Sequence, residues 1–491
     1  MLSGKRDDEG ALSPAYGSRE LRSPVPRNRM PEAGMPPSLA RQLIHDEMQL
    51  DGNPALNLAS FVTTWMEPEA DSLILESLNR NYVDADEYPR TTEIQNRCVS
   101  ILADLYHSPD GVGCATVGSS EAIHLCALAA KWRWRKRREA AGLAADKPNI
   151  VMGANVQVCW EKFARYFEVE PRFVPLTEDR FVLGVPEALQ LVDENTIAVV
   201  AILGSTYTGE YEPVSELAAA LDDLAASGGP DVPLHVDAAS GGFVAPFAQP
   251  DLEWDFRLDR VRSINVSGHK YGLVYPGVGW AIWRSPEDLP PELVFHVNYL
   301  GGDQPTFNLN FSRGASQIIA QYYNFLRLGV EGYSQVMVAL SETASYLSDA
   351  ISKIANFEIL SKPNSLPVVC MRLTHNPSYS VFDVSARLRE RGWIVPAYTM
   401  APDATNIAVL RIVVREGLSR DMADMLMADL RDTLLQLESS KEPAQGSDAK
   451  PAERHSQARH RSIPSHRPGP AKLEGAPVHA TKRQGGTAGV C

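Results

Sequence analysis

The sequence predicts an α/β protein with a mostly parallel central sheet covered by helices, followed by a small C-terminal α+β domain. Through most of the chain, apolar runs rich in β-branched residues alternate with segments of helical period, which is typical of such a sheet. After about residue 340 the order of elements changes. The length of 491 residues also exceeds what one core usually fills, so two or more domains are expected.

Composition divides the chain into four regions. Residues 1–55 are rich in Pro, Ser, Gly and charge near their start and are expected to form a flexible arm with a short helix. The large domain is expected over 56–340 and the small domain over 341–440. Residues 441–491 contain Pro and Gly throughout and no aromatic residue, so a disordered tail is expected there.

The short amphipathic helix of the N-terminal region is expected from Ser38 to Gln49. The elements of the large domain follow from its apolar runs. Four runs then predict parallel strands: Asn149–Met152, Thr196–Leu203, Pro233–Val236 and Ser263–Val266. Asp237 directly follows the third run. Because ligands collect at the carboxyl ends of parallel strands, Asp237 lies where a site is expected.

The small domain is predicted from a mixed order of elements. These are a strand over Pro367–Leu373, a helix over Val381–Arg391, a strand around Ile394, a strand over Ile407–Val414 and a helix over Arg420–Leu437. Such an order indicates an α+β layer packed on the large domain.

Composition also excludes several functions. The net charge of −14 disfavours nucleic acid and anionic membranes, because phosphate binding needs a basic surface. No segment approaches the ~18 uninterrupted apolar residues of a membrane span, and the N-terminus lacks the apolar stretch of a signal peptide. The six cysteines form no Cys-x-x-Cys pair, so no metal site and no disulfide framework is expected. Reduced thiols in a cytoplasmic protein are the simpler interpretation.

One lysine and one aspartate indicate the chemistry. Lys270 follows a buried strand and a small-residue turn in Ser-Gly-His-Lys-Tyr, and Asp237 closes the strand in His-Val-Asp-Ala-Ala-Ser-Gly-Gly. Alone, Lys270 would be interpreted as a surface lysine and Asp237 as a turn residue. Together they predict a pyridoxal phosphate site, where the amine forms an imine with the cofactor aldehyde and the carboxylate keeps the pyridine nitrogen protonated.

A phosphate cradle is predicted at Gly118-Ser119-Ser120-Glu121, which opens a helical run. The backbone amides, the two hydroxyls and the helix dipole would face the cofactor phosphate. Taken alone, the segment is also compatible with an ordinary N-capped helix. His269 lies beside the imine, where it is expected to contact phosphate or a substrate carboxylate, although a lone histidine is usually a satisfied polar residue.

These motifs carry a family resemblance. Gly-Ser-Ser-Glu-Ala, Lys-Trp-Arg-Trp-Arg-Lys-Arg, His-Val-Asp-Ala-Ala-Ser-Gly-Gly-Phe-Val-Ala-Pro-Phe, Ser-Gly-His-Lys-Tyr-Gly and Asn-Phe-Ser-Arg resemble those of the bacterial and plant glutamate decarboxylases, which are group II pyridoxal phosphate decarboxylases. The resemblance runs from about Asp51 to Leu437. It implies the fold-type I, pyridoxal phosphate transferase-like architecture.

The resemblance implies the cofactor contacts residue by residue. Pyridoxal 5'-phosphate would be held by Ser119, Ser120, Gln157, Thr206, Asp237, Ser267, His269, Lys270 and Ser312. Gln157 matches the residue that lies on the cofactor ring, and a glutamine there favours the glutamate branch. Ser312 matches a serine given to the phosphate by a neighbouring subunit, which implies a homodimer or a higher homo-oligomer.

The resemblance also implies the substrate contacts. Arg411 matches the residue that binds the α-carboxylate, a role that suits its planar fork. A buried structural ion pair is the alternative for this arginine. Ser60, Phe61, Asn81 and Asp84 match the contacts of the distal carboxylate, with Ser60 in place of a threonine.

The implied reaction is the α-decarboxylation of L-glutamate to 4-aminobutyrate and CO2, with Lys270, Asp237, His269 and Tyr299 as the catalytic residues. Tyr299 matches a loop that covers the site. Decarboxylation of aspartate or cysteine sulfinate is the alternative within this class, and a catalytically silent pyridoxal-binding protein is the alternative outside it.

Besides Ser60, two further departures from the family pattern are visible. Arg415-Glu416 stands where bacterial members have two arginines, and the sequence assigns it no function. The C-terminal tail is basic but has no tryptophan and no amphipathic pattern, so it is expected to be a solvated extension, and calmodulin is not expected as a partner.

Overall fold

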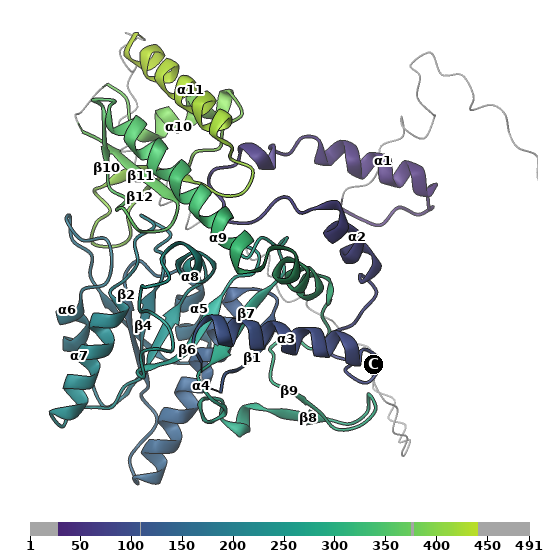
Figure 1. Cartoon of the computed structure of the whole chain (residues 1–491), viewed down its shortest axis with the longest axis vertical. Helices are drawn as coiled ribbons and strands as arrows, with labels where there is room; N and C mark the ends of the chain where they lie inside the picture. Colours follow the sequence, from purple (N-terminus) through teal and green to yellow (C-terminus); the bar gives the residue numbers. More distant parts are fainter. Residues whose placement is uncertain (1–27, 109, 375–377, 440–491) are drawn as a thin grey trace, which may run out of the picture. The chain divides into compact units, whose positions relative to one another are not determined.

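The computed structural model describes residues 28–108, 110–374 and 378–439 (Figure 1). Most of the predicted N-terminal arm, and the whole of the predicted tail at 441–491, lie outside these residues. The expected first helix is present as α1 (Pro37–Met48). No helix of the described part is both long and apolar enough to cross a membrane.

The predicted fold class is confirmed by a seven-stranded central sheet in the order β1-β7-β6-β5-β4-β2-β3. Its strands are β1 (Val112–Thr116), β2 (Asn149–Gly153), β3 (Glu170–Val174), β4 (Thr196–Ile202), β5 (Leu234–Asp237), β6 (Val261–Val266) and β7 (Gly279–Trp283). In the order of the sheet, β6, β5, β4, β2 and β3 are parallel to one another. Strand β7 is antiparallel to both of its neighbours, β1 and β6. The four predicted strands are β2, β4, β5 and β6.

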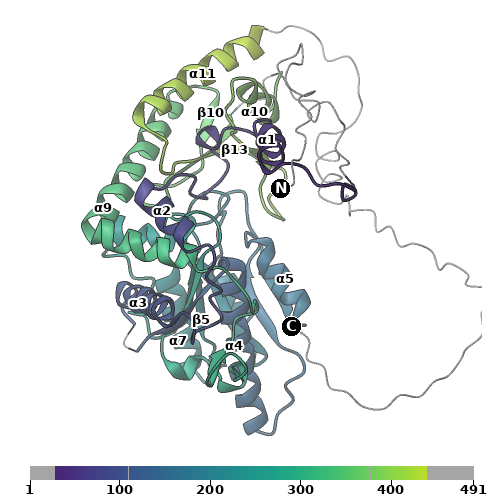
Figure 2. The ribbon, with the colours of Figure 1, turned by 90° about the vertical axis from the view of Figure 1, so that its right-hand side faces the viewer.

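Helices cover both faces of this sheet. They are α2 (Pro68–Glu76), α3 (Pro89–Leu105), α4 (Ser119–Ala140), α5 (Val158–Tyr166), α6 (Val185–Gln190), α7 (Val214–Ala226), α8 (Ala245–Ala248) and α9 (Ser316–Ser352). In β4, Val199 and Ala201 belong to the core shared with α3, α7 and α9, whereas Val200 and Ile202 pack with α4 and α5. Figure 2 shows α3 and α9 on one side and α5 on the other. The strands are apolar throughout because both faces are buried.

A second sheet has four antiparallel strands in the order β10-β11-β13-β12. They are β10 (Phe357–Ile359), β11 (Val368–Leu373), β12 (Ala397–Thr399) and β13 (Ala408–Val413), and they are accompanied by α10 (Val381–Glu390) and α11 (Arg420–Ser439). The strand expected around Ile394 lies further along the chain, at β12. Ile394 itself makes only an isolated bridge to Asn57.

The long helix α9 connects the two sheets (Figure 1). It contacts α2, α3 and α8 near the central sheet, and β10, β11 and α11 near the small one. It also passes through residue 340, where the domain boundary was expected, so the division into 56–340 and 341–440 stays a prediction. Its two halves meet at Gly329, whose φ of 59° favours glycine.

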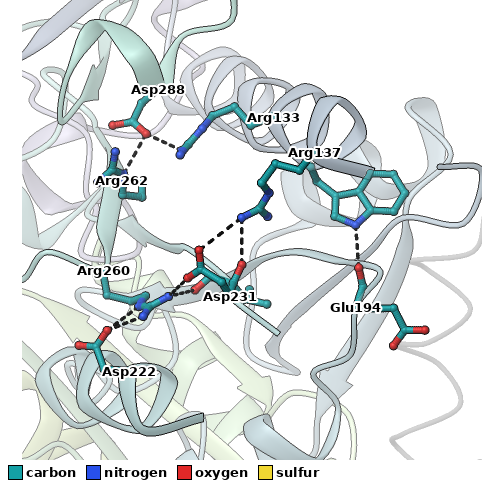
Figure 3. A network of polar contacts seen from close by, with 10 residues as sticks. Arg133, Arg137, Glu194, Asp222, Asp231, Arg260, Arg262 and Asp288 are labelled. Carbon is teal, nitrogen blue, oxygen red and sulfur yellow. Dashed lines mark hydrogen bonds and ion pairs between the residues drawn. The ribbon is translucent and has the colours of Figure 1, made fainter. Parts of the chain in front are cut away.

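An ionic network (Figure 3) lies near the residues where β5 and β6 begin, whereas Asp237 is the last residue of β5. Buried Asp288 accepts a hydrogen bond from Arg262 at 2.9 Å and pairs with Arg133 of α4. A second group consists of Arg137, Arg260, Asp222 and Asp231. Because each of these arginines already has a carboxylate partner, the network connects α4, α7 and β6 rather than offering an anion site.

Candidate functional site

The predicted lysine and aspartate come together at the carboxyl ends of β5 and β6. These strands are parallel neighbours, with Asp237 opposite Asn265, and Lys270 lies on the turn that follows β6. The Lys270 amine donates to Ser240 Oγ at 3.1 Å. Burial lowers the pKa of Lys270, and the nearby negative charge of Asp237 acts in the opposite direction. A lysine with a lowered pKa supplies the neutral amine that attacks an aldehyde.

Three donors fix the carboxylate of Asp237, which is 4% exposed. Trp160 Nε1 donates to Oδ2 at 2.8 Å, and Asn265 Nδ2 and the amide of Ala239 donate to Oδ1 at 2.9 and 3.2 Å. These donors fix the orientation of the carboxylate at the edge of the sheet where Lys270 also lies.

A further polar layer lies behind Asp237. His235 contacts Asn265 Oδ1 at 2.8 Å through Nε2 and Ser263 Oγ at 2.7 Å through Nδ1. Burial lowers the pKa of His235, so its ring is neutral. Because the Asn265 oxygen only accepts, Nε2 carries the proton, and Nδ1 accepts from Ser263. The amide of Asn265 is thereby oriented toward Asp237.

The predicted phosphate cradle is formed where α4 begins. Ser267 Oγ donates to Ser119 Oγ at 2.9 Å, and Asn265 Nδ2 also reaches Ser119 Oγ, at 3.1 Å. Ser120 is exposed beside them. A Cβ on Gly279 of β7 would lie 2.5 Å from the carbonyl carbon of Gly118, so a glycine is needed for the start of α4 to approach the sheet this closely.

His269 faces the same cradle. Its Nδ1 is buried and has no hydrogen-bond partner among the residues that the structure describes. A Cβ on Gly118 would lie 3.4 Å from His269 Cε1. Burial, with the charge of Lys270, lowers the pKa of His269 to about 4. A neutral ring with one unused polar atom is suited to contact a ligand at this position.

Arg411 and Phe61 form the substrate side of the site. Arg411 lies on β13 and is 7% exposed. Its Nη2 donates to the carbonyl of Ala59 at 2.6 Å and its Nη1 to the carbonyl of Thr206. The Phe61 ring centroid lies 5.0 Å from Arg411 Cζ and 5.7 Å from Lys270 Nζ. Phe61 thus lies near both side chains.

Arg411 also has binding capacity to spare. Its Nε is buried and unpartnered within the described part of the chain, and no described carboxylate forms an ion pair with it. The alternative of a buried structural ion pair therefore has no support among these residues. A buried guanidinium bonded only to carbonyls has the charge and the free donors for an added carboxylate.

Two more predicted residues lie close to these groups in the fold. Gln157 directly precedes α5, the helix from which Trp160 reaches Asp237. Ser60 precedes Phe61 and accepts from the amide of Val62 at 3.1 Å.

The remaining predicted residues form a separate cluster. Asn81 Nδ2 donates to Ser312 Oγ at 3.4 Å, and Asp84 accepts from the amide of Glu87 at 3.0 Å. Tyr299 is 71% exposed, in the hairpin between β8 (Phe295–Val297) and β9 (Gln304–Thr306). None of the described contacts joins this cluster to Lys270 or Asp237.

The sequence did not reveal the residues that support the site. His235 and Ser240 lie in the same motif as Asp237, and Asn265 lies in the strand before Lys270, opposite Asp237. These positions were a signal, but only the fold shows that the three residues and Trp160 surround Asp237 and Lys270.

The residues present fit pyridoxal phosphate. A partly buried amine, a hydrogen-bonded carboxylate and a helix N-terminus near the unpartnered Nδ1 of His269 match the aldehyde, the pyridine nitrogen and the phosphate of that molecule. The fold and the site thus define a pyridoxal phosphate enzyme of fold-type I.

Comparison with known proteins gives the family. The model of the pyridoxal-dependent decarboxylase conserved domain matches residues 31–374. The chain belongs to the pyridoxal-dependent decarboxylase family and is a pyridoxal phosphate-dependent carboxy-lyase.

Several similar proteins carry the name glutamate decarboxylase. The chain is 57% identical over 443 residues to glutamate decarboxylase 5 of Arabidopsis thaliana, covering 89% of this chain and 90% of that protein. It is 58% identical over 438 residues to the glutamate decarboxylase of Solanum lycopersicum, covering 88% and 87%. Among solved structures, the glutamate decarboxylase of Lactobacillus brevis matches with a TM-score of 0.84 at 44% identity, covering 87% of this chain and 99% of that one.

Proposed function

We propose that this protein removes the α-carboxylate of L-glutamate and releases 4-aminobutyrate and CO2. The similarity to proteins named glutamate decarboxylase supports this reaction. The structural observation that carries it is Arg411, a buried cation without a carboxylate partner among the described residues, which lies with Phe61 beside Lys270.

Each residue has a task in this proposal. Lys270 would hold the cofactor, Asp237 would keep a proton on its pyridine nitrogen, and Ser119, Ser267 and His269 would bind its phosphate. When bound, pyridoxal phosphate supplies a ring that accepts the electron pair of the bond being broken.

Arg411 would bind the α-carboxylate and thereby select the bond that breaks. Ser60 and Phe61 would contact the distal carboxylate of the substrate. The roles of Gln157 above the cofactor ring and of Thr206 near the cofactor oxygen stay predictions, as does the role of Tyr299 in covering the site.

We also propose a homodimer or larger homo-oligomer. Asn81, Asp84, Tyr299 and Ser312 have no described contact with the Lys270 site of their own chain, which fits a contribution to the site of a neighbouring copy. A cytoplasmic location is supported by the described cysteines, all of which are buried and unpaired.

A product assay tests the proposed reaction. The purified protein, supplied with pyridoxal phosphate, is incubated separately with glutamate, aspartate and cysteine sulfinate, and the amines formed are identified. We expect 4-aminobutyrate from glutamate, and no product from the Lys270→Ala variant. Turnover of aspartate or cysteine sulfinate in preference to glutamate would replace the proposed substrate, and absence of any product would refute the activity.

A further inference from the structure

The segment of residues 54–64, here called the substrate loop, presents Ser60 and Phe61 to the site. It begins with the short 3-10 helix η3 (Pro54–Leu56) and ends after Thr63. Its middle is joined to the small sheet, where the amide of Val413 donates to the carbonyl of Leu58 at 2.9 Å. Its far end is joined to the lysine turn, because Thr63 donates to the carbonyl of His269 at 2.9 Å and to that of Lys270 at 2.7 Å.

Arg415 closes this loop with a single guanidinium. Nη2 donates to the carbonyl of Pro54 at 2.6 Å and to that of Asn57 at 3.2 Å. Nη1 donates to Thr64 Oγ1 at 2.9 Å. The side chain is 3% exposed. Both ends of the loop are therefore held by one planar group, a geometry that lysine cannot reproduce.

Glu416 completes the closure. Its Oε1 accepts from the amide of Thr64 and from Arg415 Nη1, each at 2.9 Å. The carboxylate thus neutralises the buried guanidinium and also binds the end of the loop directly. Breaking such a pair on one side leaves a buried charge without a partner.

The strand that precedes Arg415 supplies the substrate cation. Arg411 lies in β13 and Arg415 follows its end, and Arg411 binds the carbonyl of Ala59 in the middle of the loop. The position of Phe61 over Arg411 therefore depends on a loop whose two ends are held by Arg415 and Glu416.

We propose that Arg415 and Glu416 are positioning residues that hold the substrate loop, and with it Ser60 and Phe61, in the arrangement that binds the substrate. The assignment builds on the proposed glutamate decarboxylation. Arg415 and Glu416, which stand where bacterial members of the family have two arginines, thereby have a structural role.

Steady-state kinetics of Arg415→Lys tests this assignment. We expect the KM for glutamate to rise about tenfold, because a single ammonium cannot bind residues 54, 57 and 64 together. The kcat is expected to change by less than about threefold, since Lys270 and Asp237 do not contact Arg415. Retention of pyridoxal phosphate after gel filtration should equal that of the wild type.

Amide hydrogen exchange supplies a readout that does not depend on turnover. Peptides covering 54–64 should exchange faster in Arg415→Lys, whereas peptides of the central sheet should not change. Glu358→Gln is the matched control, because it removes the ion pair with Arg372 in the same small sheet but none of the contacts of the loop.

The outcomes separate the possibilities. Unchanged KM together with unchanged exchange in the loop would overturn the assignment, and so would an equal effect of Glu358→Gln. If Arg415→Lys does not fold, the double variant Arg415→Met/Glu416→Gln, which leaves no buried charge, must show the same rise in KM. If the wild type does not decarboxylate glutamate, the proposed function fails, and the exchange data still decide whether Arg415 holds the loop.

Discussion

At the scale of single residues, the site depends on side chains that hold other side chains. Asp237 receives three hydrogen bonds, and the shortest of them comes from Trp160. Neither the carboxylate nor the lysine amine meets bulk water freely, so each small change in the surrounding donors should be measurable in cofactor binding.

Trp160→Phe should weaken cofactor binding. The change keeps an aromatic side chain, although a smaller one, and removes the indole N–H from Asp237; a hydrogen bond to a charged group contributes about 1.5–3 kcal/mol. We expect the dissociation constant of pyridoxal phosphate to rise about tenfold or more, as measured by titration of the apoenzyme. Trp134→Phe is the control, because its indole donates to the carbonyl of Glu194 instead. Equal affinity in both variants would contradict the role of Trp160.

The low pKa of His269 predicts a pH-dependent stability of the apoenzyme. Burial lowers this pKa from 6.5 to about 4. Below about pH 6.5 the unfolded chain therefore binds a proton that the folded chain does not. The free energy of unfolding is therefore not reduced by this group above about pH 6.5, and it decreases progressively as the pH falls toward 4.

Urea unfolding checks this dependence. Between about pH 7 and about pH 5 the wild type should lose roughly 2 kcal/mol more stability than His269→Gln, which lacks the ionisable ring. Other groups titrate in both proteins alike and cancel in the difference. Parallel changes in the two proteins would show that His269 is not held in a neutral form.

At the scale of elements, the start of α4 is set by its approach to β7. The helix contacts β1, β4, β6 and β7. Gly118 and Ser119 meet Gly279 so closely that no side chain fits between the two backbones. This contact places the helix N-terminus at the edge where Ser267 and His269 also lie.

Gly279→Ala should therefore displace the phosphate cradle. The added Cβ would lie 2.5 and 2.6 Å from backbone atoms of Gly118 and Ser119, which cannot rotate away. Overpacking of this kind costs about 1–3 kcal/mol. We expect a lower melting temperature and weaker retention of pyridoxal phosphate. Gly34→Ala is the control, since nothing lies within 4 Å of its added Cβ, and equal behaviour of the two variants would contradict the prediction.

The elements also differ in how well the sequence predicted them. β2, β4, β5 and β6 were recognised because a strand buried on both faces is apolar along its whole length. β3 was missed because it is an edge strand with exposed residues and a proline. The strand expected near Ile394 was displaced because Pro396 separates it from β12 and Ile394 pairs with Asn57.

At the scale of the whole molecule, the predicted site is divided. Lys270, Asp237, Arg411 and Phe61 meet within one chain, whereas the cluster of Asn81, Asp84, Tyr299 and Ser312 does not join them through any described contact. A second copy of the chain is the simplest source of the missing contacts, in line with the proposed homodimer.

Mixing two inactive variants tests this division. Lys270→Ala removes the amine, and Ser312→Asp adds a negative charge where the cofactor phosphate is expected. If each site combines Lys270 of one copy with Ser312 of the other, a co-refolded one-to-one mixture of the two variants should recover up to roughly one quarter of the wild-type activity, because about half of its dimers are mixed and each of these has one intact site. No recovery, with mixed dimers shown to form, would place both residues in the same site or exclude Ser312. Sedimentation should also show a dimer or a larger assembly.

The sequence by itself determined the fold class, the family and the chemical groups of the site. Buried strands and a lysine on a small-residue turn leave local patterns that need no coordinates. Only the tertiary structure showed that Trp160 and Asn265 hold Asp237, that Arg411 lacks a carboxylate partner in the described chain, and that Arg415 closes the loop at both ends. Such contacts join residues far apart in the sequence, and their geometry is fixed by packing rather than by local propensity.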